Sequence, residues 1–216
     1  MSAGIVKTKQ RQRAPSRRSL ETRARILDAA ERVFAAKGFD GATMRDIASE
    51  AGEPVSLIHH HGQGKEVLFH QTVARRADTL AEARRTALEV SKADGPLTVE
   101  AVLAAFFGPY LDLAAEQPEW LAYARLIAHV SADPRWRDLA AELFDPTAQV
   151  FVAELAVLLP DTPPERIASG FVFGVSSMLA LVTSDWRVAA LGGAVTDRAK
   201  ARDRLVAYTA AGLRAL

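Results

Sequence analysis

The chain has 216 residues, of which 49% are hydrophobic, so it can bury a substantial core. Its 27 basic and 26 acidic side chains leave a net charge of +1, and the absence of cysteine excludes disulfides, cysteine zinc sites and iron–sulfur clusters. The charge is unevenly distributed, because residues 1–25 hold eight basic groups and one acid and the other 191 residues carry −6. A basic arm on a mildly acidic body is typical of proteins that meet nucleic acid or an anionic membrane.

Residues 1–18 are too polar to fold by themselves, and we expect a disordered basic arm there. No apolar stretch follows the charges, so the segment does not resemble a secretory signal. A charged arm of this kind can follow phosphates or enter the minor groove of DNA. It can equally remain a solvated tail, and the sequence leaves both roles open.

Two helices are predicted next. The first covers residues 20–37, with Ser19 as its N-cap and Gly38 at its end. The second begins at Thr43, and Asp46 three residues later predicts a capping box in which aspartate takes the place of glutamate.

Gly52 ends the second helix, and Pro54 suits the first turn of a third helix that covers Pro54–His61. Two short helices around a turn with glycine predict a helix-turn-helix. In that motif the second helix presents its N-terminal side chains to the major groove of DNA.

The rest of the chain is also predicted to be helical, and no stretch alternates apolar and polar residues as a strand does. Six further helices are expected over Lys65–Val90, 97–116, 118–131, 134–159, 163–187 and 196–215. Pro109 and Pro146 fall inside two of these ranges, so the helices there are expected to kink or divide. The prediction is an all-α protein of about nine helices, with a helix-turn-helix domain over residues 19–66 and a helical bundle over residues 67–216.

Ile167 to Ser184 is a stretch of 18 residues without a charge, which is the lower limit for a membrane-spanning helix. Gly170, Gly174 and several Ser and Thr residues dilute its hydrophobicity. We interpret the stretch as a buried helix of a soluble protein, and we expect a cytoplasmic protein that contacts no membrane.

Residues 22–69 carry an ordered set of motifs: ILDAA…F…KG in the first helix, T-x-x-x-I-A-x-x-A-G in the second, and a closing GKE-x-L-F. This set resembles the DNA-binding domain of the TetR/AcrR family of transcriptional regulators. The resemblance implies a palindromic double-stranded operator as the partner. The residues that it places at the DNA are Thr43, Arg45, Val55, Ser56, Leu57, His59, His60, His61 and Lys65.

Two positions depart from the family pattern. His59 stands where the family usually has tyrosine, and Gly62 replaces an aromatic side chain that usually plugs the third helix into the core. An empty plug site is expected to loosen the recognition helix, by roughly 3 kcal/mol if the site is fully buried.

The histidine run His59–His61 does not predict a metal site, because three consecutive residues on a helix point about 100° apart. Neither a metal nor a cofactor is expected.

Beyond about residue 70 the resemblance implies only a general plan, a ligand cavity among the middle helices and a dimer formed by the last two. Aromatic side chains gather in the predicted helices over 97–131 and 134–159. A mostly apolar cavity with a few polar groups is the usual form of a small-molecule site. The ligand candidates are Phe107, Tyr110, Trp120, Tyr123, Leu126, His129 and Phe144.

The predicted helix over 163–187 carries small residues at a spacing of four, which allows two helix axes to approach closely. With the last helix it forms the candidate homodimer interface. Its members are Gly170, Phe171, Gly174, Ser177, Met178, Leu181, Leu205 and Tyr208.

The favoured function is a ligand-responsive, homodimeric transcriptional regulator, a repressor released from its operator by a small apolar effector. The alternative is an all-helical ligand- or partner-binding protein whose DNA binding is weakened by Gly62 and the apolar Val55 and Leu57. An all-α enzyme is disfavoured, because no nucleophile–base pair and no phosphate loop is apparent in the sequence.

Overall fold

The computed structural model describes residues 16–192 and 197–215, and these residues contain eleven α-helices and no strand. Most of the predicted basic arm lies outside the described residues. The helices are α1 (Arg17–Gly41), α2 (Met44–Ala51), α3 (Val55–Gly62), α4 (Lys65–Ala93), α5 (Val99–Glu116), α6 (Pro118–Ala132), α7 (Arg137–Leu143), α8 (Asp145–Leu158), α9 (Pro164–Thr183), α10 (Asp185–Gly192) and α11 (Arg198–Ala215), with a 3-10 turn η1 (Pro134–Trp136).

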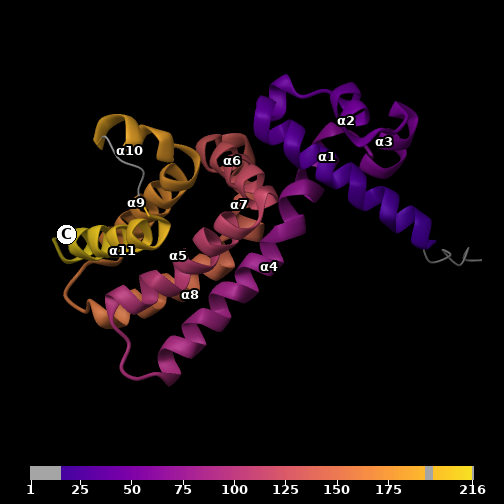
Figure 1. The fold of residues 1–216 in the computed structure, drawn as a ribbon. Helices are drawn as coiled ribbons and strands as arrows, with labels where there is room; N and C mark the ends of the chain where they lie inside the picture. The colour runs from indigo at the N-terminus through magenta and orange to yellow at the C-terminus, as the bar shows by residue number, and fades with distance from the viewer. Residues whose placement is uncertain (1–15, 193–196, 216) are drawn as a thin grey trace, which may run out of the picture.

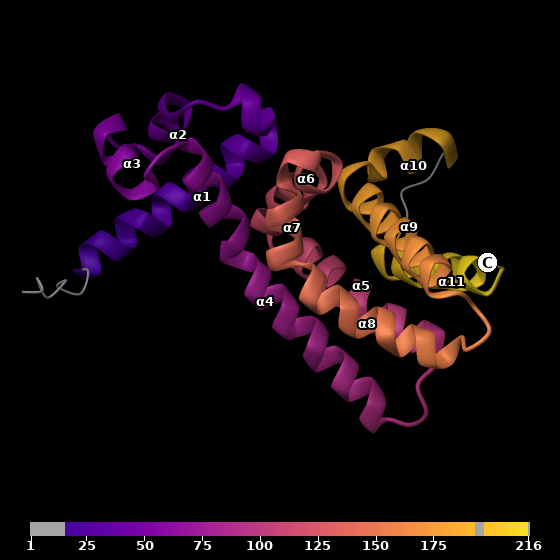
Figure 2. The ribbon, with the colours of Figure 1, turned by 180° about the vertical axis from the view of Figure 1, so that it is seen from behind.

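The molecule has two parts, which are connected by the long helix α4. Helices α1, α2 and α3 form a module at one end, and α4 runs from this module along the bundle of the remaining helices (Figure 1). Helix α5 packs against α4, α9 and α11 in the middle of the bundle. Both views place α10 and α11 at the end of the molecule farthest from α3 (Figure 2). The predicted all-α architecture is confirmed.

Helix α1 begins earlier than predicted because Ser16, and not Ser19, is its N-cap. The Ser16 hydroxyl accepts a hydrogen bond from the backbone N–H of Ser19. The basic residues Arg17 and Arg18, which we assigned to the disordered arm, therefore belong to the first helical turn. The predicted end at Gly38 corresponds to a kink, where φ is +67° before one more helical turn leads to Gly41.

The two longest predicted helices of the C-terminal half are divided. The range 134–159 becomes η1, α7 and α8, with Pro134 and Pro146 in the first turns of η1 and α8, where a missing N–H costs nothing. The range 163–187 ends at Thr183, because Ser184 leaves the helical region and α10 starts anew. Pro109, in contrast, lies inside α5, which continues through it to Glu116.

Within the described residues, α9 is the one helix with the length and mean hydropathy of a membrane span. It packs in the bundle against α5, α6, α8 and α11. Its inward face, which includes Ile167, Phe171 and Met178, is buried in the hydrophobic core.

The core continues from the N-terminal module into the bundle through an aromatic cluster. The Phe69 ring at the start of α4 lies 5.0 Å from Phe34 of α1 and 4.4 Å from Trp136 of η1. Phe39 contacts both Phe69 and Trp136, at centroid distances of 5.2 and 4.8 Å. Direct ring contacts therefore connect η1 with the N-terminal module.

Candidate DNA-binding face and effector pocket

Helix α2 begins with the predicted capping box. Thr43 Oγ1 accepts from the Asp46 backbone N–H at 3.1 Å, and Asp46 Oδ2 accepts from the Thr43 N–H at 2.9 Å. Lys37 forms an ion pair with Asp46 Oδ1 at 2.8 Å. The hydrogen bonds from Lys37 and Thr43 lower the pKa of Asp46 to about 2, so this cap is ionised at neutral pH.

Helix α3 presents one face to solvent and anchors the other through Ile58, which is fully buried. Of the residues predicted on its DNA face, Val55, Ser56, His59 and His60 are exposed, whereas Leu57 and His61 are half-buried. Burial lowers the pKa of His61, and electrostatic interactions with His60 and Arg23 lower it further. His61 is therefore a neutral hydrogen-bonding group near pH 7, not a cation.

The space expected to be empty at Gly62 is filled by Leu68 from α4. A Cβ atom at Gly62 would lie 3.3 Å from both Cβ and Cδ2 of Leu68, and Leu68 itself is buried. The anchor that the third helix lacks is thus provided by the following helix. The sequence shows the missing aromatic residue, but it does not show which side chain closes the gap.

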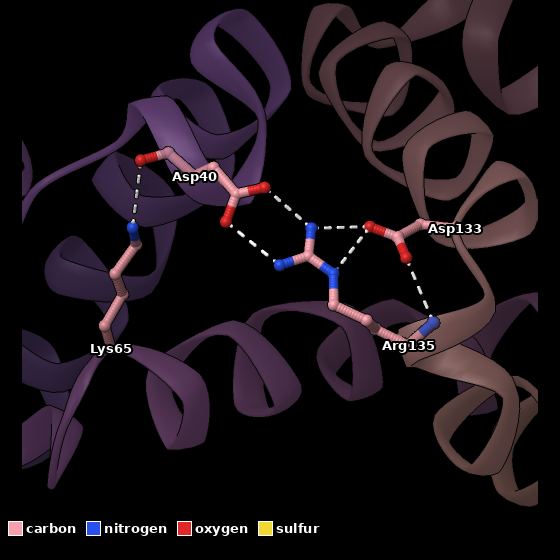
Figure 3. A network of polar contacts seen from close by, with 4 residues as sticks. All are labelled: Asp40, Lys65, Asp133 and Arg135. Atoms are coloured by element: carbon pink, nitrogen blue, oxygen red, sulfur yellow. Dashed lines mark hydrogen bonds and ion pairs between the residues drawn. The ribbon is translucent and has the colours of Figure 1, made fainter.

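Two basic residues of the predicted DNA face differ in their surroundings. Arg45 is exposed on α2. Lys65, at the start of α4, is half-buried, donates from Nζ to the Asp40 carbonyl oxygen at 3.3 Å, and lies 4.5 Å from the centre of the Phe39 ring (Figure 3). Lys65 must leave these partners, or share them, to contact a phosphate.

The same segment of the module is tied to the bundle by Arg135. Its Nη1 and Nη2 atoms donate to the two carboxylate oxygens of Asp40 at 3.0 and 2.7 Å, and its Nε donates to Asp133 at 2.9 Å (Figure 3). Arg135 lowers the pKa of both carboxyls, and its own pKa is raised by them. Arg135 and Asp40 are exposed to solvent and Asp133 is half-buried, so we expect this ion pair to add little to the stability of the fold.

Most of the predicted ligand residues are packed core. Phe107, Tyr110, Trp120, Tyr123 and Leu126 are buried. The Tyr123 hydroxyl already has a hydrogen-bond partner inside the protein, because it donates to the Val73 carbonyl oxygen at 2.9 Å. Phe144 is half-buried, and His129 is exposed in a hollow beside Phe39 and Trp136, away from the bundle interior.

An apolar pocket of about 320 Å³ lies instead at the end of the bundle, between α5, α6, α9, α10 and α11. Its walls are Leu111, Ala114, Leu121, Leu181, Val182, Asp185, Trp186, Val188, Ala189 and Ala201. The seven predicted ligand residues are not among them, although several lie one helical turn away. The sequence offered no signal for this pocket, because part of its wall comes from α10. The sequence predicted residues 185–187 as the end of the preceding helix and assigned residues 188–192 to no helix.

The predicted dimer helices α9 and α11 lie at the surface of the bundle, but most of the predicted side chains face inward. Phe171, Met178 and Leu205 are buried in the core of their own subunit. A Cβ atom at Gly174 would lie 2.7 Å from Thr209 and 2.9 Å from Phe107, so its small size is required by packing within the subunit. Gly170 is buried, and Ser177 and Leu181 are half-buried.

The exposed apolar side chains on these helices are different ones. Phe173 of α9 is 62% exposed and Val172 is 57% exposed. Tyr208 of α11 is 71% exposed, and it is the member of the predicted set that faces solvent. The face that can meet another molecule is therefore rotated from the predicted one.

Comparison with known proteins identifies the family. Residues 26–72 match the family described as bacterial regulatory proteins of the tetR type. Residues 104–212, half of the chain, match the tetracyclin repressor-like C-terminal domain. The chain belongs to the TetR family.

Individual TetR relatives match over the N-terminal region. The transcriptional repressor AcnR of Corynebacterium efficiens is 37% identical over 67 residues, which are 29% of this chain and 36% of AcnR. The transcriptional activator FasR of Mycolicibacterium smegmatis is 32% identical over 87 residues, which are 40% of this chain and 39% of FasR. The match thus spans little more than a third of each relative.

Solved TetR structures match over most of the chain. A TetR-like regulator from Rhodococcus sp. RHA1 has a TM-score of 0.62 at 18% identity and covers 93% of this chain and 98% of its own. The regulator FadR of Bacillus subtilis, solved with stearoyl-CoA, has a TM-score of 0.64 at 14% identity and covers 88% and 98%. At these identities the likeness shows a shared fold.

Proposed function

We propose that this TetR-family protein is a homodimeric transcriptional repressor that leaves its operator when a small molecule binds in the bundle. The observation that carries the proposal is the helix-turn-helix, in which a capped α2 supports α3 and leaves Val55, Ser56, His59 and His60 exposed at neighbouring positions. A protein that binds chromosomal operators works in the cytoplasm, and we propose that location.

The dimer is proposed to form through the exposed faces of α9 and α11. Phe173 and Tyr208 project from these helices as large apolar groups, and a pocket between them includes Gly170 and Gly212. Two copies are needed because a palindromic operator presents its half-sites about 34 Å apart, so two α3 helices must be held at that spacing.

Helix α6 is the proposed route from the pocket to the DNA-binding module. Leu121, near the start of α6, lines the pocket. The end of α6 leads to Asp133, which accepts a hydrogen bond from Arg135, and Arg135 also donates to Asp40. Helix α1 packs against α6 along the way. A ligand that displaces α6 would thus move Arg135, and with it Asp40, which accepts hydrogen bonds from Arg135, and Lys65, which donates to the Asp40 carbonyl oxygen. Coupling of this kind is commonly about 1–3 kcal/mol and acts equally in both directions.

The DNA face is tested by selecting bound duplexes from a random pool and titrating the selected operator by fluorescence anisotropy at several salt concentrations. Arg45→Ala and Lys65→Ala should weaken binding to all sequences alike, and each should lower the salt slope by about 1. Arg85→Ala, an exposed arginine elsewhere on α4, is the matched control and should bind as wild type. Undiminished affinity in the Arg45→Ala, Lys65→Ala double variant contradicts the proposed face.

The same selection decides between the proposal and the alternative of a protein with weakened DNA binding. One reason for that alternative was the missing plug at Gly62, and Leu68 fills that space. The apolar Val55 and Leu57 remain its support. If wild-type protein enriches no sequence from the pool, the alternative is favoured over the repressor.

A further inference from the structure

A charged side chain lies inside the bundle with no acidic partner in the part of the chain that the structure describes. Arg84 of α4 is only 7% exposed, and its Nε donates to the Phe106 carbonyl oxygen at 2.9 Å. The guanidinium carbon sits 3.7 Å from the centre of the Phe106 ring, and Nη2 lies 4.0 Å from Met178 Sδ. Among the residues that the structure describes, the groups with an electrostatic effect on Arg84 are the phenols of Tyr110 and Tyr123, and no carboxylate pairs with it.

Burial of an unpaired guanidinium lowers the stability of the folded protein unless a bound group compensates for the lost hydration. A buried cation loses its hydration, and one carbonyl and one aromatic face replace only part of that loss. Burial lowers the pKa of Arg84 to about 10, so the group is still positively charged at neutral pH. A position that served only packing would be filled as well by leucine or methionine.

A second polar group close by also lacks a partner. The Tyr110 hydroxyl is buried and forms no hydrogen bond with the described residues, in contrast to the hydroxyl of Tyr123. Tyr110 stands one turn after Phe106 on α5, and its ring centre lies 5.9 Å from the Arg84 guanidinium carbon. A phenol and a guanidinium are both donors, so an acceptor that carries negative charge satisfies both.

The apolar pocket at the end of the bundle begins one helical turn from Tyr110 and from Met178, the side chain that contacts Arg84. Ala114, a wall residue, lies one turn beyond Tyr110 on α5, and Val182 lies one turn beyond Met178 on α9. The pocket walls are mostly apolar, and Arg84 and Tyr110 are buried outside them. A ligand with an apolar body and one anionic end matches an apolar pocket that has a buried cation and a buried phenol beyond its walls.

We infer that the bundle binds a carboxylate with an apolar body, whose carboxylate is received by Arg84 and the Tyr110 hydroxyl while the body occupies the pocket. The inference rests on the proposed function, because it names the chemical class of the effector. It changes the expected effector from a simple apolar molecule to an apolar anion. Bidentate pairing with a planar carboxylate is the geometry that a guanidinium favours.

The test compares carboxylates with alcohols of the same body, decanoate with decanol and 4-phenylbutyrate with 4-phenylbutanol, by calorimetry on the full-length dimer. Wild-type protein should bind at least one carboxylate at least ten-fold more tightly than its alcohol. Arg84→Met should remove that preference and leave alcohol binding within about two-fold. The inference is overturned if neither pair shows a preference, or if Arg84→Met keeps it.

Two further variants separate ligand binding from folding. Tyr110→Phe removes only the unpartnered hydroxyl, so it should keep the wild-type unfolding temperature and lose several-fold in carboxylate affinity. Leu121→Trp narrows the pocket and should weaken carboxylate and alcohol alike. Unchanged carboxylate affinity in Tyr110→Phe would argue against the hydroxyl as a ligand-binding group and overturn the assigned site.

The operator titration distinguishes this inference from the proposed function. If a carboxylate binds in an Arg84-dependent way and also releases the operator, both stand. If it binds in that way but leaves operator affinity unchanged, the anion site stands and the proposed coupling fails.

Discussion

At the scale of single residues, the small side chains of α9 illustrate how one pattern can have two causes. The spacing of Gly170 and Gly174 predicted a close approach of helices, and that approach exists. It occurs within the subunit, where Thr209 of α11 and Phe107 of α5 occupy the space beside Gly174. The glycine is therefore required by the core of its own subunit, and the proposed dimer interface uses other residues.

Gly174→Ala should destabilise the protein by about 1–3 kcal/mol, because its methyl group would lie 2.7 Å from Thr209 Cγ2. Thermal unfolding followed by circular dichroism measures the effect. Gly108→Ala is the control, since its Cβ would meet only Arg202 Cδ at 4.0 Å and alanine is the better helix former. A stability for Gly174→Ala equal to that of the control would contradict the packing described for α9.

The capping carboxylate Asp46 should make stability depend on pH in acid. Its folded-state pKa, about 2, lies below the ordinary value of 3.8, so the folded state binds the proton less readily than the unfolded state. The stabilisation is fully present above about pH 4 and is lost as the pH falls toward 2. Urea unfolding across this range should show a smaller loss in Asp46→Asn. Lys37→Met, which removes the largest cause of the shift, should give an intermediate result.

At the scale of helices, α1 and α4 are joined by a buried ion pair. Arg76 donates from Nε and Nη2 to the two carboxylate oxygens of Glu31 at 2.7 and 3.0 Å. Glu31 is almost completely buried, and this desolvation raises its pKa despite the guanidinium beside it. The contact joins α4 to α1 of the DNA-binding module. Because Glu31 is buried, the free energy needed to separate the pair is large.

A double-mutant cycle on this pair should be strongly non-additive. Glu31→Ala should cost about 3 kcal/mol, because it leaves Arg76 partly buried without its partner. The Glu31→Ala, Arg76→Ala double variant should lose much less than the sum of the single variants. Unfolding free energies from urea titration provide the test. Additive losses would mean that the two side chains act independently.

At the scale of the whole molecule, the exposed apolar groups of α9 and α11 lie far from the helix-turn-helix (Figure 1). In the proposed dimer, this arrangement leaves α3 free for DNA while the exposed faces of α9 and α11 meet a second copy. It also explains the apolar composition of α9, since one face of the helix is covered by its own subunit and the other is available to a partner.

Phe173→Glu should convert the protein to monomers, because two copies of a new carboxylate would be buried in a symmetric interface. Sedimentation velocity measures the oligomeric state. Val157→Glu is the control, since Val157 is 76% exposed on α8 and should tolerate the charge without dissociation. A Phe173→Glu variant that sediments like wild type would place the interface elsewhere.

The helical class, the helix-turn-helix and the Thr43–Asp46 capping box could all be predicted, because caps, glycine breaks and helical periodicity act within a few residues of the chain. These features are determined by the sequence alone. Val55, Ser56, His59 and His60, which the sequence analysis places at the DNA, are exposed on α3.

Only the tertiary structure decided which face of α9 is inward, that Leu68 closes the gap at Gly62, and that the pocket lies against α10. It also placed Arg84 in the core, although arginine in a long helix is normally expected at the surface. The physical reason is common to all four. Local periodicity indicates that a helix has an apolar face, but its neighbours determine which side chains are covered, and those neighbours come from distant parts of the chain.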